Sequence, residues 1–230
     1  MRHFATRLAA AMFTMLAALT VSEGALAQAK TPTPADSSSK TADVEHRVQS
    51  ARRGGGIRVG QWHLNGAQLP SGVSASSTPE VEGYVRAGLD LHLVLENSVG
   101  FWRQRQATAA GGGLLGNGAS SIDNYIIPQY TSVVFYPVTK PNDRLEPYVR
   151  GGLGFALGVQ DPQGGSGGIA LTPGFGATGG LGVEWRATEA LGLAVSGRYQ
   201  WIRFFQEFAG AQTYQGPALE AGITYRFQFR

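Results

Sequence analysis

The chain has 230 residues, of which 33 are glycine, 15% are charged and none is cysteine. Soluble domains carry about 25% charged residues, so this charge content is low. A sequence without cysteine excludes disulfide bonds, a thiol nucleophile, thiolate metal sites and a lipidated N-terminal cysteine. The net charge is only +3, and the sequence has no cluster of basic residues within a nucleic-acid-binding motif. We therefore expect no nucleic-acid partner.

The N-terminal segment has the pattern of an export signal. It begins with Arg2 and Arg7, continues with an apolar run from Leu8 to Val21, and reaches small residues at Ala25 and Ala27. The apolar run of about 14 residues is shorter than the roughly 20 residues that a membrane-spanning helix needs. We therefore expect residues 1–27 to be a signal peptide that is cleaved after Ala27.

The next segment, residues 28–56, changes to a composition rich in Lys, Thr, Pro, Ser, Asp and Gly. It has no sustained apolar periodicity, so it cannot bury enough apolar surface to offset its conformational entropy. We expect a disordered periplasmic linker here, followed by one folded domain over residues 57–230.

The rest of the chain alternates with a period of two residues. From Val81 to Glu96 the odd positions are apolar or small, whereas the even positions carry nearly all the charge. Such alternation predicts a β-strand between two different environments. The pattern recurs over 147–159, 175–186, 191–203 and 217–229, and less regularly over 57–66, 98–106 and 122–138. The sequence therefore predicts eight strands and an all-β fold.

The connections between these strands alternate in length. Tight turns are expected near Glu96–Asn97 and at residues 187–190, and longer loops at 67–78, 107–121, 160–174 and 205–213. An even number of strands with alternating short turns and long loops is typical of transmembrane β-barrels. A soluble β-sandwich is the alternative, but it does not explain the export signal. We place Pro128 near the barrel rim because proline is awkward in a central strand.

Aromatic residues form two predicted groups along the strands. With both termini on the periplasmic side, Trp185, Phe227 and Phe229 fall at the periplasmic rim. Under the same orientation the outer rim receives Phe175, Tyr199 and Trp201. Aromatic belts at both membrane surfaces are typical of outer-membrane barrels.

Three segments carry a family resemblance: EPYVRGGLG at 146–154, GGLGVEW at 179–185 and ITYRFQF at 223–229. They are similar to strands of the OmpA/OmpW-like small outer-membrane β-barrels, including the opacity-protein relatives and related porins. The resemblance covers residues 56–230 and implies a location in the outer membrane of a Gram-negative bacterium. It implies contact with lipid, lipopolysaccharide and the assembly machinery that reads the C-terminal strand. One departure is Arg230, because such strands usually end on the aromatic residue itself.

The even positions predict a charged barrel interior. An eight-stranded barrel has room inside only for side chains, and buried charges there must be paired. The predicted ion-pair network consists of Glu82, Arg86, Asp90, Arg150, Glu184, Arg198, Glu220 and Arg226. Counting positions along the strands pairs Arg150 with Glu184 and Arg198 with Glu220. A charge-filled lumen favours a mainly structural or surface role for a monomeric, non-enzymatic protein.

Other functions remain open at this point. Glycines on the inward face would leave space for a narrow channel or a conduit for small hydrophobic ligands. The pair Asp90 and His92 could act as the base of a lipid-modifying enzyme, but no serine is placed for attack, so we expect no catalytic residues. Adhesion through the loops is a further alternative. The histidines lack ligand spacing, and we expect neither a metal nor a cofactor.

Overall fold

The computed structural model describes residues 53–65, 77–107, 121–137, 144–163 and 169–227. The predicted signal peptide and nearly all of the predicted linker lie outside these described residues, as does Phe229. Among the described residues, no helix is long and apolar enough to cross a membrane.

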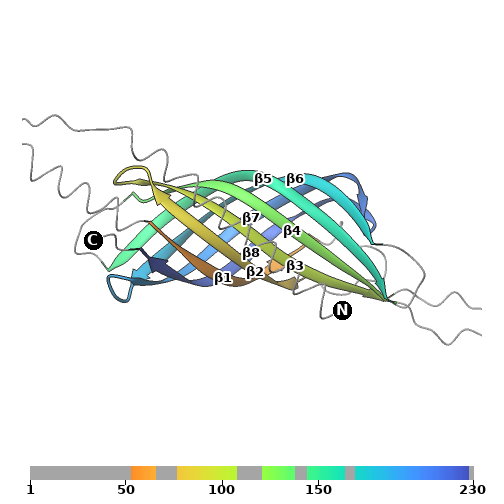
Figure 1. The fold of residues 1–230 in the computed structure, drawn as a ribbon, viewed down its shortest axis with the longest axis horizontal. Helices are drawn as coiled ribbons and strands as arrows, with labels where there is room; N and C mark the ends of the chain where they lie inside the picture. The colour runs from red at the N-terminus through yellow and green to blue at the C-terminus, as the bar shows by residue number, and fades with distance from the viewer. Residues whose placement is uncertain (1–52, 66–76, 108–120, 138–143, 164–168, 228–230) are drawn as a thin grey trace, which may run out of the picture. The chain divides into compact units, whose positions relative to one another are not determined.

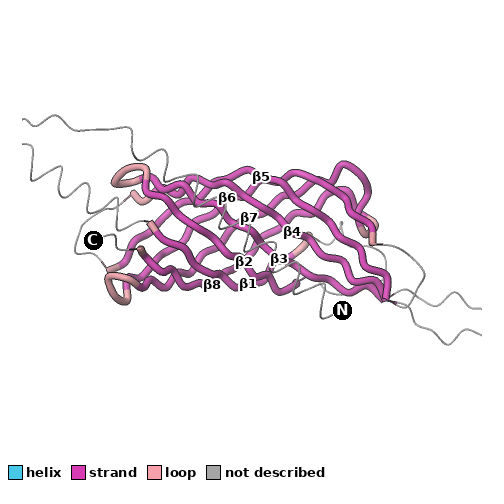
Figure 2. Tube along the Cα trace, in the orientation of Figure 1, coloured by secondary structure: helices cyan, strands magenta, loops and turns pink. Residues whose placement is uncertain are grey.

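Eight antiparallel strands close into a barrel (Figures 1 and 2). They are β1 (Gly54–His63), β2 (Ser77–Gly88), β3 (Leu93–Ala107), β4 (Ser121–Phe135), β5 (Leu145–Gln163), β6 (Ala170–Arg186), β7 (Leu191–Phe208) and β8 (Ala211–Arg226). Each strand pairs with its neighbours in sequence, and β1 closes the sheet against β8 in a register that runs from Gly54 opposite Arg226 to Trp62 opposite Ala218. Closure removes the sheet edges, so every strand can satisfy its backbone hydrogen bonds inside a bilayer. The predicted fold class and strand number are confirmed.

The two faces of the barrel wall differ as the alternation predicts. On β6, Leu181 is 69% exposed on the outer face, whereas Glu184 is fully buried inside. On β7, Val195 is 60% exposed and Arg198 only 3%. Aliphatic and aromatic side chains cover the outer face all round, far beyond the apolar patches that soluble proteins expose. The barrel therefore turns its apolar face to lipid and its charged face inward, which excludes the soluble sandwich.

The first hairpin corrects the predicted strand boundaries. Residues 81–96 are not one strand: β2 ends at Gly88 and β3 begins at Leu93. Asp90 forms the turn, because its Oδ1 accepts the backbone N–H of His92 (2.6 Å) and that of Leu93 (2.7 Å). The alternation stays in phase across this turn, with even positions inward on both strands, so the period shows no break there. The predicted turn at Glu96–Asn97 is wrong, and Asp90 does not lie within a membrane-spanning strand.

Other boundaries also shift. The barrel begins at Gly54 rather than at residue 57, and the predicted loop at 205–213 is a tight hairpin. Its turn residues Ala209 and Gly210 have φ angles of 48° and 86°. Pro128 lies in the middle of β4 rather than at the rim, and its missing N–H coincides with a gap in the β3–β4 ladder between Val99↔Gln129 and Trp102↔Ile126.

Candidate functional site: the filled barrel interior

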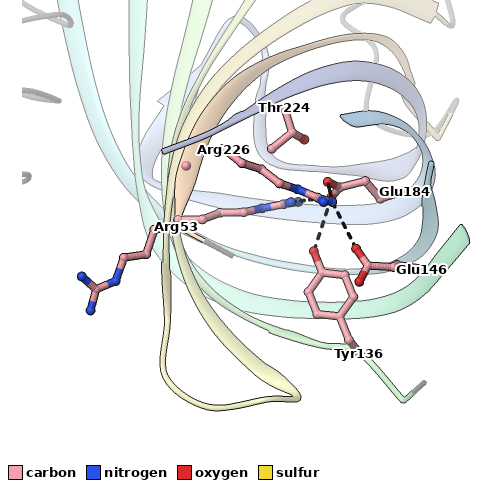
Figure 3. Close-up of a pocket in the computed structure, with 8 residues that line it drawn as sticks. Arg53, Tyr136, Glu146, Glu184, Thr224 and Arg226 are labelled. Carbon is pink, nitrogen blue, oxygen red and sulfur yellow. Dashed lines mark hydrogen bonds and ion pairs between the residues drawn. The ribbon is translucent and has the colours of Figure 1, made fainter. Parts of the chain in front are cut away.

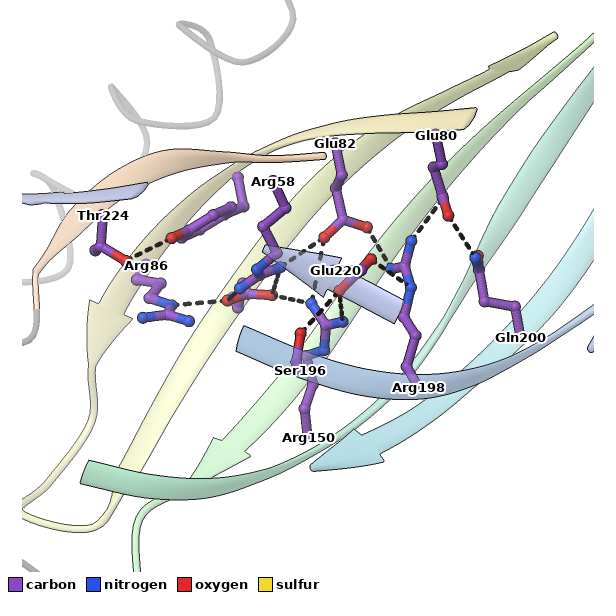
Figure 4. Close-up of polar contacts among 12 residues, drawn as sticks. Arg58, Glu80, Glu82, Arg86, Arg150, Ser196, Arg198, Gln200, Glu220 and Thr224 are labelled. Carbon is purple, nitrogen blue, oxygen red and sulfur yellow. Dashed lines mark hydrogen bonds and ion pairs between the residues drawn. The ribbon is translucent and has the colours of Figure 1, made fainter. Parts of the chain in front are cut away.

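Two arginines occupy the centre of the barrel interior (Figure 4). Arg58, on β1, lies 2.6 Å from a carboxylate oxygen of Glu82 and 2.6 Å from one of Glu96. Arg150, on β5, approaches the same two carboxylates from the opposite wall, at 3.2 Å and 3.0 Å. Arg150 also lies 3.0 Å from Glu220 on β8. Two carboxylates held between two guanidinium groups thus tie four strands across the lumen.

Arg198 extends this cluster toward the end of the barrel that holds the Ala209–Gly210 turn, which we call the far end. Its guanidinium lies 2.6 Å from Glu80 and 2.7 Å from Glu220, and it also pairs with Glu82. The amide of Gln200 donates a hydrogen bond of 2.8 Å to Glu80 (Figure 4). Both carboxylates of β2 are therefore bound from β7 on the other side of the barrel.

A second cluster lies toward the opposite end, where the short turns after β2 and β6 are found; we call this the turn end. Arg86 connects it to the centre, with Nε 2.7 Å from Glu96 and Nη1 2.7 Å from Glu184. Arg226 bridges Glu184 at 2.6 Å and Glu146 at 3.1 Å. Glu146 also pairs with Arg186. The two clusters form one continuous chain of ion pairs along the barrel.

A small cavity opens within the turn-end cluster (Figure 3). Its volume is about 10 Å³, close to the smallest space that holds one water molecule. Its lining includes Tyr136, Thr224 and the ion-paired Arg86, Glu184 and Arg226. A space of this size, walled by ion-paired groups, accommodates a water molecule and is too small for an organic ligand.

The charges of the network balance. It contains six arginines and six glutamates: Arg58, Arg86, Arg150, Arg186, Arg198, Arg226, Glu80, Glu82, Glu96, Glu146, Glu184 and Glu220. All but Arg186 have side chains exposed by 7% or less. Desolvating so many charges is costly, and the cost is offset only when each carboxylate and guanidinium has several partners. The eleven buried members meet this condition because the arginines come from both sides of the lumen.

An apolar layer fills the lumen at the far end. Trp62, Trp102 and Tyr214 stack edge to face, with ring centroids 5.7 Å and 6.3 Å apart. Phe204 and Phe208 continue the stack toward the Ala209–Gly210 turn, with centroids 4.7 Å apart. All five rings are buried. The interior therefore has two zones, a long charged one and a short aromatic one.

The structure brings seven of the eight predicted network residues into the charged zone. Asp90 is the exception, because it serves the β2–β3 turn. Arg198 lies within 2.7 Å of Glu220, but the predicted pair of Arg150 with Glu184 does not form. Arg150 faces Gly180 in the β5–β6 register, and Glu184 faces Glu146. The count along the strands erred because β5 begins at Leu145, opposite Trp185, rather than at Pro147.

Sequence reasoning missed Arg58, Glu80, Glu96 and Glu146, which belong to the same network. All four occupy even positions, the parity of the inward face on every strand. Arg58 lies in a strand of weak alternation, and Glu80 and Glu146 lie at or before the predicted strand starts. Extending the even parity through the irregular segments would have found them.

The candidate acid–histidine pair has a structural role. The His92 ring nitrogen Nδ1 lies 2.8 Å from the backbone oxygen of Tyr136, and the Asp90 carboxylate accepts hydrogen bonds from the backbone N–H groups of His92 and Leu93. These contacts join the turns after β2 and β4 at the turn end.

The described members of the predicted aromatic belts lie on the outer face. Trp185 and Phe227 are exposed near the turn end. Toward the far end, Phe175 packs against Trp201 with ring centroids 5.3 Å apart, and Tyr199 is also exposed. The outer face thus carries aromatic residues near both ends of an aliphatic band.

No protein-family model and no curated protein matches the sequence. Solved structures do match. OprG, an outer membrane protein of Pseudomonas aeruginosa, shares 14% identity with a TM-score of 0.50, over 77% of this chain and 97% of that one. Ail of Yersinia pestis shares 12% identity with a TM-score of 0.48, over 76% of this chain and 99% of that one. The neisserial surface protein NspA shares 17% identity with a TM-score of 0.47, over 75% of this chain and 97% of that one. At these identities the likeness concerns the fold alone. The chain therefore has the fold of the small eight-stranded outer-membrane β-barrels, with an apolar outer face and a charged interior.

Proposed function

We propose that this protein is a sealed barrel with a structural and surface role in the outer membrane, and not a pore or an enzyme. The observation that carries the proposal is the single ion-pair network of six arginines and six glutamates that spans the charged zone. A conducting pore needs mobile water or unpaired wall charges along its length. Here the guanidinium groups of facing walls meet the same carboxylates in the middle of the lumen.

The inward glycines do not leave a passage in this arrangement. A Cβ atom at Gly182 would lie 2.6 Å from the Tyr148 hydroxyl, and one at Gly180 would lie 2.7 Å from Cβ of Arg198. At Gly152 the equivalent position overlaps the Ser132 hydroxyl. Neighbouring side chains already occupy the space that the missing side chains vacate, so these glycines serve close packing.

The aromatic layer argues against a conduit for hydrophobic ligands. It offers an apolar surface only at the far end, and Gln200 and Glu80 lie beneath it on the inner face. An apolar molecule moving inward from Trp62 or Tyr214 would have to displace ion pairs. An apolar path through the described interior would require a rearrangement of the whole network.

The finer predictions about partners belong to the same proposal. The apolar outer face contacts outer-membrane lipid, and the far end faces lipopolysaccharide if the turn end is periplasmic. The C-terminal strand β8 is the segment that the assembly machinery would read. One barrel is a complete folding unit, because β1 and β8 pair with each other and leave no edge to share.

Planar-bilayer conductance tests the proposal. The mature chain, refolded and checked for heat-modifiable gel mobility, should show no unit conductance steps. A matched variant with Trp62→Ala, Phe204→Ala, Arg150→Ala and Glu220→Ala thins both zones without adding net charge, and it should show steps if it folds. Clear unit steps from the unaltered barrel would overturn the sealed-lumen proposal.

A further inference from the structure

A polar patch lies on the lipid-facing surface of β3 and β4. Asn97 on β3 faces Thr131 on β4, and Gln129 lies two residues from Thr131 on the same strand, opposite Val99. All three occupy odd positions, the parity of the outer face, and Thr131 is exposed while the two amides are partly exposed. We call these three residues the amide patch.

The amide patch lies inside the apolar band rather than at a membrane surface. Toward the turn end the same two strands carry Leu93 and Phe135. Toward the far end they carry the stacked rings of Phe101 and Tyr125, whose centroids are 5.6 Å apart. Asn97 lies four residues from both Leu93 and Phe101 along β3, midway between these groups. The neighbouring strands place Val85 beside Asn97, and Leu153 beside Thr131.

The amide groups are only partly satisfied within one barrel. The Thr131 hydroxyl donates a hydrogen bond of 2.7 Å to the side-chain oxygen of Asn97. Among the described residues, no partner is found for the Asn97 side-chain N–H groups or for either end of the Gln129 amide. Hydrocarbon offers no hydrogen bonds, so unpaired amides facing it are costly. The cost is removed when the patch meets another polar surface in the membrane.

We infer that two copies of this protein associate side by side in the membrane through the outer face of β3 and β4. A carboxamide carries both donors and an acceptor, so it is complementary to itself. A two-fold axis through the amide patch would bring like groups together, as isologous interfaces do. Lipid tails supply no such partners.

The surface next to the amide patch permits close approach. Gly83 on β2 faces outward opposite Val99, and a Cβ atom there would have no neighbour within 4 Å. In membranes, association depends on close packing and on polar contacts, because lipid and apolar side chains are equally hydrophobic. Gly83 allows close packing, and the neighbouring amides supply the polar contacts. The inference extends the proposed function, since it concerns complete, sealed barrels, and it revises the expectation of a monomer.

Cysteine cross-linking in vesicles tests this inference. The sequence contains no cysteine, so one introduced residue is a unique reporter. In the mature chain refolded into phosphatidylcholine vesicles at high dilution, Val99→Cys should form a covalent dimer on oxidation. The control Val195→Cys, on the outer face of β7, should yield at least tenfold less dimer. Adding Asn97→Leu and Gln129→Leu to Val99→Cys should lower its yield at least tenfold.

Two results would overturn the inference: equal yields from Val99→Cys and Val195→Cys, or a yield from Val99→Cys that the two leucines do not change. Both mean that lipid alone surrounds the amide patch. Heat-modifiable gel mobility verifies that each variant is folded, and the single change Gln129→Met replaces the double variant if that fails to fold. This experiment measures cross-linking and not conductance. The cross-linking result would therefore stand even if the sealed-lumen proposal failed.

Discussion

Arg58 illustrates how single residues hold this barrel together. Its side chain is 1% exposed, and its guanidinium contacts Glu82 and Glu96 and lies over the Tyr84 ring at 3.8 Å from the ring centroid. An arginine suits this position because its planar group binds carboxylates with several donors and stacks on aromatic rings. Arg58 offsets much of the desolvation cost of the buried Glu82 and Glu96 carboxylates. Its contribution to stability therefore depends on these two partners.

Replacing Arg58 with methionine should therefore destabilise the barrel strongly. Breaking a buried pair by removing one partner costs about 3–5 kcal/mol, because uncompensated charge remains. Urea unfolding in lipid vesicles measures this change. The control Arg203→Met removes an exposed arginine on the outer face of β7 and should cost less than about 1 kcal/mol. Adding Glu96→Gln to Arg58→Met should recover part of the loss; strict additivity would show that the two residues are not coupled.

Depth in the membrane decides the cost of a charge on the outer face. Leu181 is 69% exposed on β6 and lies between the aromatic residues Phe175 and Trp185. Leu181→Arg should cost about 2–4 kcal/mol in refolding equilibria, as expected near the bilayer midplane. Leu89, which alternation alone places within a strand, lies in the β2–β3 turn, and Leu89→Arg should cost about 0–1 kcal/mol. Similar costs for both variants would contradict the assigned membrane band.

At the scale of elements, the β7–β8 hairpin has a tightly constrained turn. Phe208 and Ala211 pair across a two-residue turn, and both turn residues have positive φ. Such turns match the twist of the flanking strands but usually carry Asn or Gly at the first position. Ala209 occupies this position and is packed in the aromatic layer, where it is 8% exposed. The small alanine side chain fits the crowded aromatic layer, although its backbone has a strained positive φ angle.

Substitutions at Ala209 should separate backbone strain from packing. Ala209→Val places a β-branched residue at φ 48° and should cost about 1–3 kcal/mol. Ala209→Gly relieves the strain and should leave the free energy of unfolding unchanged or raised by about 1 kcal/mol. Ala221→Val, on the outward face of β8, is the control and should be neutral within about 0.5 kcal/mol. A neutral Ala209→Val would mean that the turn relaxes to another conformation.

At the scale of the whole molecule, the barrel is complete from β1 onward. The backbone oxygen of Arg53 accepts a hydrogen bond of 2.9 Å from Phe227, which joins the two ends of the sheet. Sheet closure therefore begins at Arg53. We expect the export signal to act before the barrel folds, and we expect the linker to contribute no strand to it.

Deleting residues 30–52 while keeping the signal peptide should leave assembly intact. The deleted segment has no apolar face to dock, and Arg53 with its bond to Phe227 is retained. Gel mobility of unheated samples and membrane fractionation measure the outcome, and mass spectrometry should place the mature N-terminus at Gln28. An assembly defect would show that the linker is a structural element. A deletion that continues through Ile57 is the matched comparison and should impair assembly, because it removes part of β1.

The amino-acid sequence by itself determined the strand number, the antiparallel barrel and, within the regularly alternating strands, which residues face inward and which face outward. These follow from local alternation, since an apolar exterior and a charged interior impose the same period on every strand. Only the tertiary structure decided which charges meet. Arg150 contacts Glu82 and Glu96 across the lumen rather than Glu184 on the next strand, because register and strand tilt set the heights of facing side chains. The turn at Asp90 escaped prediction for a related reason: the alternation continued in phase through it, and only hydrogen bonds between the strands show where the chain reverses.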